Sequence, residues 1–449
     1  MPEKTIDVGA MIDAKGMGPR QWAVIVLCAL VALLDGLDLQ SIGLAAPAIA
    51  QQLHIPPQSL GAVFSAALAG LTLGAFSLGP VADRVGRKTV LVAATICFGL
   101  FTLATAYAGT FTELLVCRFL AGAGLGGAMP SFVSLASEYV PSSRRAAIVS
   151  LLWAAFPLGG VVGGVMASYM IPVYGWQSIF IFGGTVPLVI ALLLIVALPE
   201  SIAFLINRNR PPEQIARSLR RVFPALDVPA DASFVFRRDE NRDASVGQLF
   251  AEGRAAGTLL LWVAFFFAFM ILVTNSSWTP SLLRSVGVPV EQAALALAMF
   301  NFGSLFGSAV AGALVAALGP ARVLSLTLVG GAIAYAFVGW AAPSIVGITI
   351  AQAAFGLLLG CASSGLIALA AIYYPSAIRS TGVGWATAMG RFGSFVGPLV
   401  VGALVGRHLN VQTIFTAVAA SILIGALACV LMARVAPDKA PASGLTTPR

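Results

Sequence analysis

Long apolar segments alternate with short polar ones along most of the chain. A bilayer core about 30 Å thick is crossed by about 20 apolar residues in a helix, and twelve segments reach that length. They cover residues 21–49, 59–78, 89–108, 112–137, 145–169, 177–198, 257–283, 291–317, 322–342, 346–372, 380–407 and 411–434. The pattern therefore predicts an all-α integral membrane protein with twelve transmembrane helices.

One polar stretch is much longer than the other turns and divides the spans into two sets of six. Residues 199–256 contain "NRNRPPEQIARSLRRVF" and "FRRDENRD", which are rich in charge. We interpret this stretch as a linker between an N-terminal half, residues 21–198, and a C-terminal half, residues 257–434. Residues 1–20 and 435–449 are then a polar N-terminal segment and a C-terminal tail.

The two halves resemble each other at an offset of 233–234 residues. Tyr139, Pro141, Ser142, Arg145, Gly122, Gly126, Gly159 and Gly163 match Tyr373, Pro375, Ser376, Arg379, Gly356, Gly360, Gly393 and Gly397. This repeat predicts two parallel six-helix units, an arrangement in which transporters hold their substrate between the halves near the midplane. Asp35, Asp38 and Arg118 break the repeat, because Ala268, Ile271 and Gln352 stand at the matching positions. The fold alone does not explain these three charges.

Composition agrees with a membrane protein, and the charge distribution gives its orientation. Only 10% of the residues are charged, against about 25% in soluble proteins. The side with both termini and the linker holds 22 of the 26 lysines and arginines. Because positive charge marks the cytoplasmic side, we expect a multi-pass inner-membrane protein with cytoplasmic termini and linker. The basic charge is then a sign of topology, and no nucleic-acid partner is expected.

The segment "GPVADRVGRK" at residues 79–88 is predicted to form a loop after the second span. Its glycines permit a tight turn, and its acid can pair with an arginine or cap the third span. The segment resembles the G-x-x-x-D-R-x-G-R-K loop of the major facilitator superfamily, which implies a conformational latch. A plain positively charged loop is the alternative. The latch positions are Gly79, Asp83, Arg84, Gly86, Arg87 and Lys88. In the second half Ala316 replaces the acid.

Three further motifs narrow the resemblance. "LDGLDL" in span 1, "GLGGAMP" in span 4 and "YPSAIRSTGVGWATAMGRFGSFVGP" at residues 374–398 are similar to the aromatic acid:proton symporter family. "DGLDLQ" resembles the hydroxyphenylpropionate branch more closely than the hydroxybenzoate branch, whereas the long linker departs from it. The charged residues of that family fall on Asp35, Asp38, Arg118, Glu138, Arg379 and Arg391.

The two acids of span 1 lie deep in the predicted membrane. At 1.5 Å per residue, Asp35 is roughly 21 Å and Asp38 roughly 26 Å from the cytoplasmic end of the span. Arg118 in span 4 is predicted near the depth of Asp35. Intramembrane ionisable residues usually serve a pathway, so we expect a proton-coupling site of Asp35, Asp38 and Arg118. The carboxylates carry the proton, and the nearby arginine favours their charged form. A structural acid–arginine pair is the alternative. Gly36 lets a backbone or ligand approach between the acids.

Several residues are candidates for holding the substrate or for gating. An arginine can grip a carboxylate bidentately, and both Arg118 and Arg391 are candidates, with bridging between helices as the alternative. For the aromatic ring we consider Trp278 with Asn275, and then Asn301 and Trp385. Ordinary packing or lipid contact is the alternative for these aromatic side chains.

The last predictions concern two residues at helix ends and the kind of protein that the motifs indicate. Glu138 and Arg379 lie at cytoplasmic helix ends, where gating or tethering is expected. No hydrolase triad, metal cluster or phosphate loop is evident, so we expect no enzyme activity, no metal and no cofactor besides protons. The sequence predicts a monomeric importer of an aromatic carboxylate with protons. A proton-coupled exporter of the same fold and a membrane sensor that does not transport are the alternatives.

Overall fold

The computed structural model describes residues 5–14, 16–223, 233–235, 245–375 and 378–435. Within these ranges, twelve helices are long and apolar enough to cross a bilayer. They are α2 (Pro19–Gln52), α3 (Leu60–Val85), α4 (Arg87–Thr105), α5 (Phe111–Glu138), α6 (Ser142–Tyr174), α7 (Gln177–Ala197), α10 (Ala255–Ser285), α11 (Val290–Leu318), α12 (Pro320–Ala341), α13 (Ile345–Tyr373), α14 (Arg379–Gly406) and α15 (Val411–Val435). The predicted helical membrane fold is confirmed.

One predicted boundary is wrong, and it lies in the latch motif. The loop expected at residues 79–88 is almost entirely helical, because α3 continues to Val85 and α4 begins at Arg87. Only Gly86 separates the two helices, with a φ of 109°. A residue with a side chain rarely adopts this backbone conformation, and this explains why a glycine occupies the turn.

The repeated glycines perform the same packing in both halves. A side chain at Gly159 of α6 would collide with the Leu33 carbonyl of α2, and one at Gly393 of α14 would collide with the Phe266 carbonyl of α10. Gly122 and Gly356 likewise face carbonyls of α3 and α11. Close approach of helix backbones at small residues stabilises helix pairs in membranes. The internal repeat read from the sequence is therefore a repeat of helix contacts.

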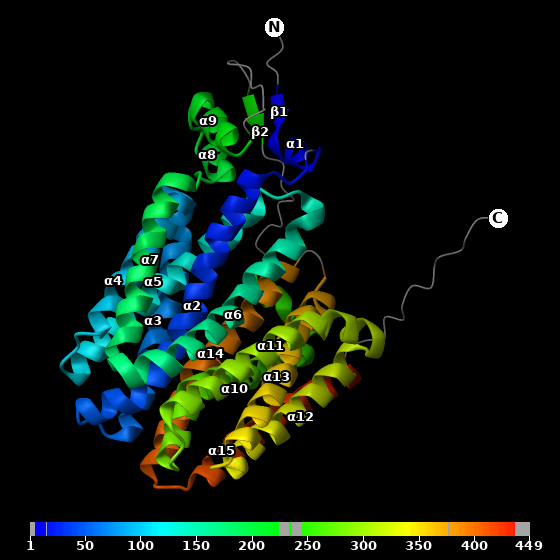
Figure 1. Ribbon diagram of the computed structural model, residues 1–449. Helices are drawn as coiled ribbons and strands as arrows, with labels where there is room; N and C mark the ends of the chain where they lie inside the picture. Colours follow the sequence, from blue (N-terminus) through cyan, green and yellow to red (C-terminus); the bar gives the residue numbers. More distant parts are fainter. Residues whose placement is uncertain (1–4, 15, 224–232, 236–244, 376–377, 436–449) are drawn as a thin grey trace.

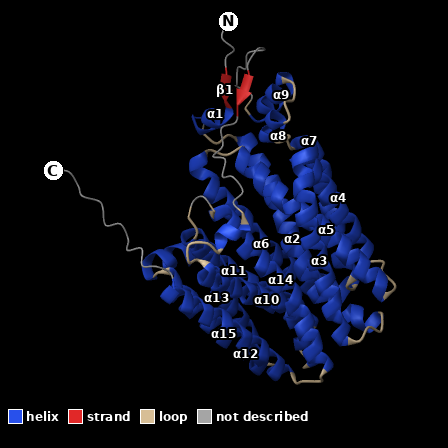
Figure 2. Ribbon diagram, turned by 180° about the vertical axis from the view of Figure 1, so that it is seen from behind, coloured by secondary structure: helices blue, strands red, loops and turns tan. Residues whose placement is uncertain are grey.

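A small cap covers one end of the N-terminal half (Figure 1). It consists of β1 (Thr5–Asp7), α1 (Val8–Ala14), α8 (Ile202–Asn207), α9 (Pro212–Val222) and β2 (Ser233–Val235), with β1 and β2 paired in parallel. We call this end of the molecule the linker face, and the opposite end the far face. Figure 2 shows the same cap from behind, above the helical bundle.

The linker is more structured than its composition suggests. Apolar side chains of α9, among them Ile215, Leu219 and Val222, join the buried core of the N-terminal half. The second end of the linker forms the 3-10 helix η2 (Val246–Leu249) before α10, and a further 3-10 turn, η1 (Pro57–Ser59), precedes α3. The described part of the linker thus belongs to the halves it joins.

The first helix is fixed to α6 by one carboxylate. Asp13 of α1 accepts hydrogen bonds from the backbone N–H of Ser142 at 2.6 Å and from its hydroxyl at 3.0 Å. These hydrogen bonds hold the pKa of Asp13 below its ordinary value. The contact satisfies a free N–H at the start of α6, as an N-cap does.

Two hydrogen bonds join the halves toward the far face. Gln40 of α2 donates a hydrogen bond to Ser276 of α10 at 3.3 Å, and Ser65 of α3 donates to the Phe395 carbonyl of α14 at 2.9 Å. Gln40 and Ser65 both lie about 30 Å along their helices from the linker face, at about 1.5 Å per residue. The interface between the halves is therefore closed on the side opposite the cap.

Candidate functional site

A buried ion pair lies inside the N-terminal half. Both carboxylate oxygens of Asp38 on α2 are 3.1 Å from Nη1 of Arg118 on α5. Arg118 is fully buried and Asp38 is 4% exposed. The pairing corrects the depth expectation, which matched Arg118 with Asp35. Helical side chains lean toward the N-terminus of their own helix. Arg118 on α5 thus leans toward the far face, where Asp38 lies one turn beyond Asp35.

Two threonines and an aromatic ring complete the environment of Arg118. Its Nη2 donates to Thr102 at 3.2 Å and its Nε to Thr105 at 3.3 Å, both on α4. Thr102 in turn donates to Asp38 at 3.2 Å. The Phe180 ring covers the guanidinium at 5.2 Å. Every side-chain nitrogen of Arg118 has at least one partner, and four hydrogen bonds use most of its five N–H groups.

The partners of Arg118 were missed in the sequence analysis. Thr102 and Thr105 lie three residues apart in an apolar span and therefore share a helix face. That spacing was the available sign of a polar neighbour for a buried charge.

Asp35 lies apart from this pair and faces the other half. Its carboxylate is buried, at 5% exposure, and interacts electrostatically with Asp38 and with Arg391 of α14. Gly36 beside it lies against the Phe156 backbone of α6, the close backbone approach expected for this glycine. The described residues offer no hydrogen-bond donor to the Asp35 carboxylate. Asp35 and Arg391 thus form a charge interaction between the two halves.

Arg391 is partly buried and is held weakly by the protein. Its Nη2 donates to the sulfur of Met129 on α5 at 2.7 Å, and its buried Nη1 has no hydrogen-bond partner among the described residues. A thioether is a weak acceptor, and an unsatisfied buried donor is costly. Because a guanidinium binds a carboxylate through two parallel N–H groups, Arg391 is suited to receive an acidic ligand.

The C-terminal half carries an uncharged counterpart of the buried ion pair. Gln352 of α13 occupies the repeat position of Arg118 and donates to Oδ1 of Asn275 on α10 at 3.0 Å. Thr279 donates to the same oxygen at 2.8 Å. Nδ2 of Asn275 and Oε1 of Gln352 are buried without a partner among the described residues. Both side chains are fully buried, so this network contains one donor and one acceptor without a partner inside the described part of the protein.

The structure does not gather the predicted ring-binding residues into one site. Trp278 is 1% exposed, donates to the Pro398 carbonyl at 3.0 Å and packs edge-on against Phe64. Asn301 donates to the Leu297 carbonyl of its own helix at 2.9 Å. Trp385 lies six residues into α14 from its linker-face end and stacks on Trp262. Trp278 contacts the other half through Phe64 instead of standing free, and Trp385 lies near the opposite end of the membrane region.

The latch residues connect helix ends within the N-terminal half. Arg87 contacts Asp83 at 3.6 Å and also bonds Glu138 and Ser134 of α5. Glu138 accepts a further hydrogen bond from Ser201 at 2.6 Å. Of the two roles predicted for Asp83, the structure shows the pairing with an arginine, whereas Glu200 accepts from the backbone N–H of Lys88 at 2.9 Å.

The remaining gating candidates make local contacts. Arg84 is exposed, and Gly79 lies inside α3 with open space around it. Arg379 donates at 3.5 Å to the Tyr374 carbonyl of its own turn, as Arg145 does to the Val140 carbonyl in the first half. The carboxylate-centred connection at Glu138 has no counterpart in the described part of the second half, where Ile372 stands at the matching position.

Comparison with known proteins places this geometry in a family. The sequence profile of the Major Facilitator Superfamily matches residues 28–287 and 260–449. The 4-hydroxybenzoate transporter PcaK of Pseudomonas aeruginosa is 39% identical, over 92% of this chain and 92% of its own. The 3-(3-hydroxy-phenyl)propionate transporter of Escherichia coli is 35% identical, over 92% and 95%. Whole-chain identity is thus higher to the hydroxybenzoate transporter, although the span-1 motif resembles the other branch.

A solved structure supports the fold independently. The crystal structure of a D-xylose-proton symporter aligns with a TM-score of 0.71 at 17% identity, and the alignment covers 93% of this chain and 98% of the symporter. At this low identity the likeness concerns the arrangement of helices alone.

Proposed function

Since the chain belongs to the Major Facilitator Superfamily, we propose that it imports an aromatic carboxylate together with protons by alternating access. The observation that carries the proposal is Arg391, a partly buried arginine between the halves that has one weak partner and a buried Nη1 without a partner among the described residues. The relatives named above transport a hydroxybenzoate and a hydroxyphenylpropionate, which both combine a carboxylate with a phenol ring. We therefore assign the substrate carboxylate to Arg391 and not to Arg118, whose three side-chain nitrogens all have partners.

Asp35 and the substrate carboxylate compete for Arg391, and this competition couples proton movement to substrate movement. When Asp35 is ionised it attracts the Arg391 guanidinium, so a substrate carboxylate has to compete with it. A proton on Asp35 removes that competition, and the substrate then binds the arginine. Loss of the proton to the cytoplasm restores the competing charge and favours release. In this scheme the proton and the substrate enter and leave together, while the Asp38–Arg118 pair stays intact as a structural element.

The uncharged network on α10 and α13 is the best partner for the phenol hydroxyl. Nδ2 of Asn275 can donate to the hydroxyl oxygen, and Oε1 of Gln352 can accept its proton. We propose a monomer in the bacterial inner membrane, with the linker face in the cytoplasm because that face holds most of the basic residues. Closure at the far face supports an inward-open conformation in this orientation.

Uptake into proteoliposomes tests the proposal. Radiolabelled 4-hydroxybenzoate and 3-(3-hydroxyphenyl)propionate are offered with and without an inward proton gradient. We expect accumulation that requires the gradient and collapses with a protonophore. A sodium requirement, or uptake that ignores both conditions, contradicts proton symport. Accumulation driven only by an outward-directed gradient indicates the exporter.

A further inference from the structure

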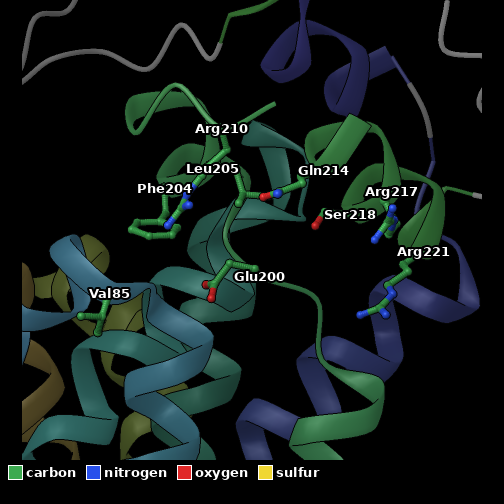
Figure 3. Close-up of a pocket in the computed structure, with 9 residues that line it drawn as sticks. All are labelled: Val85, Glu200, Phe204, Leu205, Arg210, Gln214, Arg217, Ser218 and Arg221. Atoms are coloured by element: carbon green, nitrogen blue, oxygen red, sulfur yellow. The ribbon is translucent and has the colours of Figure 1, made fainter. Parts of the chain in front are cut away.

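A pocket of about 420 Å³ lies at the linker face, away from the site between the halves (Figure 3). Its walls come from the end of α3, from the segment after α7, and from α8 and α9. The lining residues are Val85, Glu200, Phe204, Leu205, Arg210, Gln214, Arg217, Ser218 and Arg221. Figure 3 shows Arg217 and Arg221 extending from α9 on one side, Arg210 and Phe204 on the other, and Glu200 between them. The transport mechanism uses none of the three arginines.

The charge of this pocket is strongly positive. Within the described ranges, no carboxylate forms an ion pair with Arg210, Arg217 or Arg221. The lone acid in the lining, Glu200, is turned toward the backbone, where its Oε1 accepts from the N–H groups of Lys88 and Ser201, both at 2.9 Å. The Lys88 ammonium lies close enough to Arg221 for the two charges to interact. Among the described residues, three arginines and Lys88 thus share a small space in which Glu200 is the only acid that lines the pocket.

The packing of α9 against the N-terminal half fixes the orientation of the helix, and with it the positions of Arg217 and Arg221. Ile215, Leu219 and Val222 are buried in the core of the N-terminal half. Arg217 and Arg221 are four residues apart, so they lie on the same helix face, where like charges repel each other. A phosphate group relieves that repulsion and accepts paired N–H bonds from a guanidinium. The chemistry of the pocket therefore points to a phosphate ligand.

The surroundings indicate that the phosphate belongs to a lipid. Val85, at the end of membrane helix α3, lines the pocket and is 51% exposed. Below it α7 presents Leu192 and Val196 with exposures of 64% and 78%. The Lys88 ammonium joins the two regions, because it donates to the Ile195 carbonyl of α7 at 2.7 Å. A basic pocket beside an apolar, lipid-facing helix end is the arrangement that binds anionic lipid headgroups. We propose that this pocket binds the phosphate headgroup of an anionic phospholipid from the adjoining leaflet.

Lipid titration of the purified full-length protein tests the inference. The protein in a mild detergent receives phosphatidylglycerol, phosphatidylcholine or inorganic phosphate at matched concentrations. Thermal unfolding and native mass spectrometry then report stabilisation and bound lipid. We expect phosphatidylglycerol to raise the melting temperature, because a ligand that binds the folded state stabilises it. With a contribution of about 1 kcal/mol per basic residue, Arg217→Gln/Arg221→Gln should bind phosphatidylglycerol about 30-fold more weakly.

Two further variants separate the site from general effects of charge and folding. Arg144→Gln/Arg322→Gln removes the same charge from two exposed arginines elsewhere on the linker face and should bind phosphatidylglycerol like the parent. Arg217→Lys/Arg221→Lys keeps the charge but loses the paired N–H bonds, so it should bind phosphatidylglycerol more weakly than the parent but more tightly than the Arg217→Gln/Arg221→Gln protein.

Three outcomes would overturn the inference. One is equal stabilisation by phosphatidylcholine and phosphatidylglycerol, and another is unchanged lipid binding by the Arg217→Gln/Arg221→Gln protein. The third is equal stabilisation by inorganic phosphate through the same arginines, which would make the ligand a free phosphate instead of a lipid.

Discussion

Asp35 and Asp38 are one helical turn apart, yet replacement of each by asparagine should have opposite consequences. Asparagine is close in size to aspartate, but its side chain carries no charge and neither gains nor loses a proton near neutral pH. At position 38 it removes the only charged partner that the structure gives to Arg118. At position 35 it removes a charge that makes no hydrogen bond among the described residues. The two variants therefore separate a structural charge from a coupling charge.

The magnitude follows from burial. Arg118 is fully buried, and removal of one partner from a buried ion pair costs about 3–5 kcal/mol. We expect Asp38→Asn to lower the free energy of unfolding by this amount, with a drop in melting temperature on the order of 5 °C. Asp35→Asn should change the free energy of unfolding by about 1 kcal/mol or less. It should retain substrate binding, because the neutral side chain resembles the protonated acid.

The assay compares three activities of the same purified variants. Thermal unfolding in one detergent reports stability. Exchange of external for internal substrate in proteoliposomes needs no net proton movement, whereas accumulation against a gradient does. Asp35→Asn should exchange substrate but fail to accumulate it. As a control, Asp38→Asn/Arg118→Gln removes both charges and should recover part of the stability lost in Asp38→Asn.

Two results would refute this reasoning. Full accumulation by Asp35→Asn would exclude Asp35 as the obligatory proton carrier. A melting temperature of Asp38→Asn equal to that of the parent would show that the Asp38–Arg118 pair does not stabilise the fold. If the roles of the two acids are reversed, Asp38→Asn keeps its stability and loses only accumulation.

The other predictions concern single side chains. Arg391→Lys keeps the charge but loses the planar guanidinium that binds a carboxylate through two N–H groups. The affinity for a carboxylate substrate, measured by isothermal titration, should fall about tenfold. Unchanged affinity would contradict the assignment of the substrate carboxylate to Arg391. Gln352→Leu should weaken binding of 4-hydroxybenzoate by about 1–3 kcal/mol while binding of benzoate changes little, and an equal loss for both acids would show that Gln352 does not recognise the hydroxyl. Glu138→Gln removes the carboxylate that links Arg87 to Ser201, so we expect a lower transport rate with unchanged substrate affinity. Unaltered transport kinetics would argue against a latch.

The sequence predicts the number and positions of the transmembrane helices well because the bilayer imposes strong constraints on them. Apolar length sets the number of spans, and the helices differ from the predicted spans by a few residues at most ends. The exception is α3, where the charged motif before Gly86 hides a continuing helix. Hydropathy marks where a chain leaves the apolar region, whereas the backbone hydrogen bonds of a helix can continue beyond it.

The site is predicted less completely, because sequence spacing does not give side-chain direction. The depth count matches Arg118 with Asp35, but the lean of the side chain on α5 pairs it with Asp38. Trp278 has the right chemistry for a ring contact, yet its indole N–H is already bonded to a backbone carbonyl. Gln352 was visible only as the neutral residue at the repeat position of Arg118. Its value as a candidate comes from the unpaired Oε1 in the folded protein.

The charged residues that break the internal repeat explain how two similar halves can couple proton movement to substrate movement. Both halves use the same glycine contacts, so each moves as a packed unit. The first half encloses its Asp38–Arg118 pair, while the second half keeps a neutral network at the matching place. Asp35 belongs to one unit and Arg391 to the other. Because their attraction weakens with distance, any rocking of the halves changes the competition between Asp35 and a substrate for the same arginine. We infer that coupling depends on this placement across the interface, so moving the acid to Ala268, its repeat position in the other half, should not restore accumulation to Asp35→Asn.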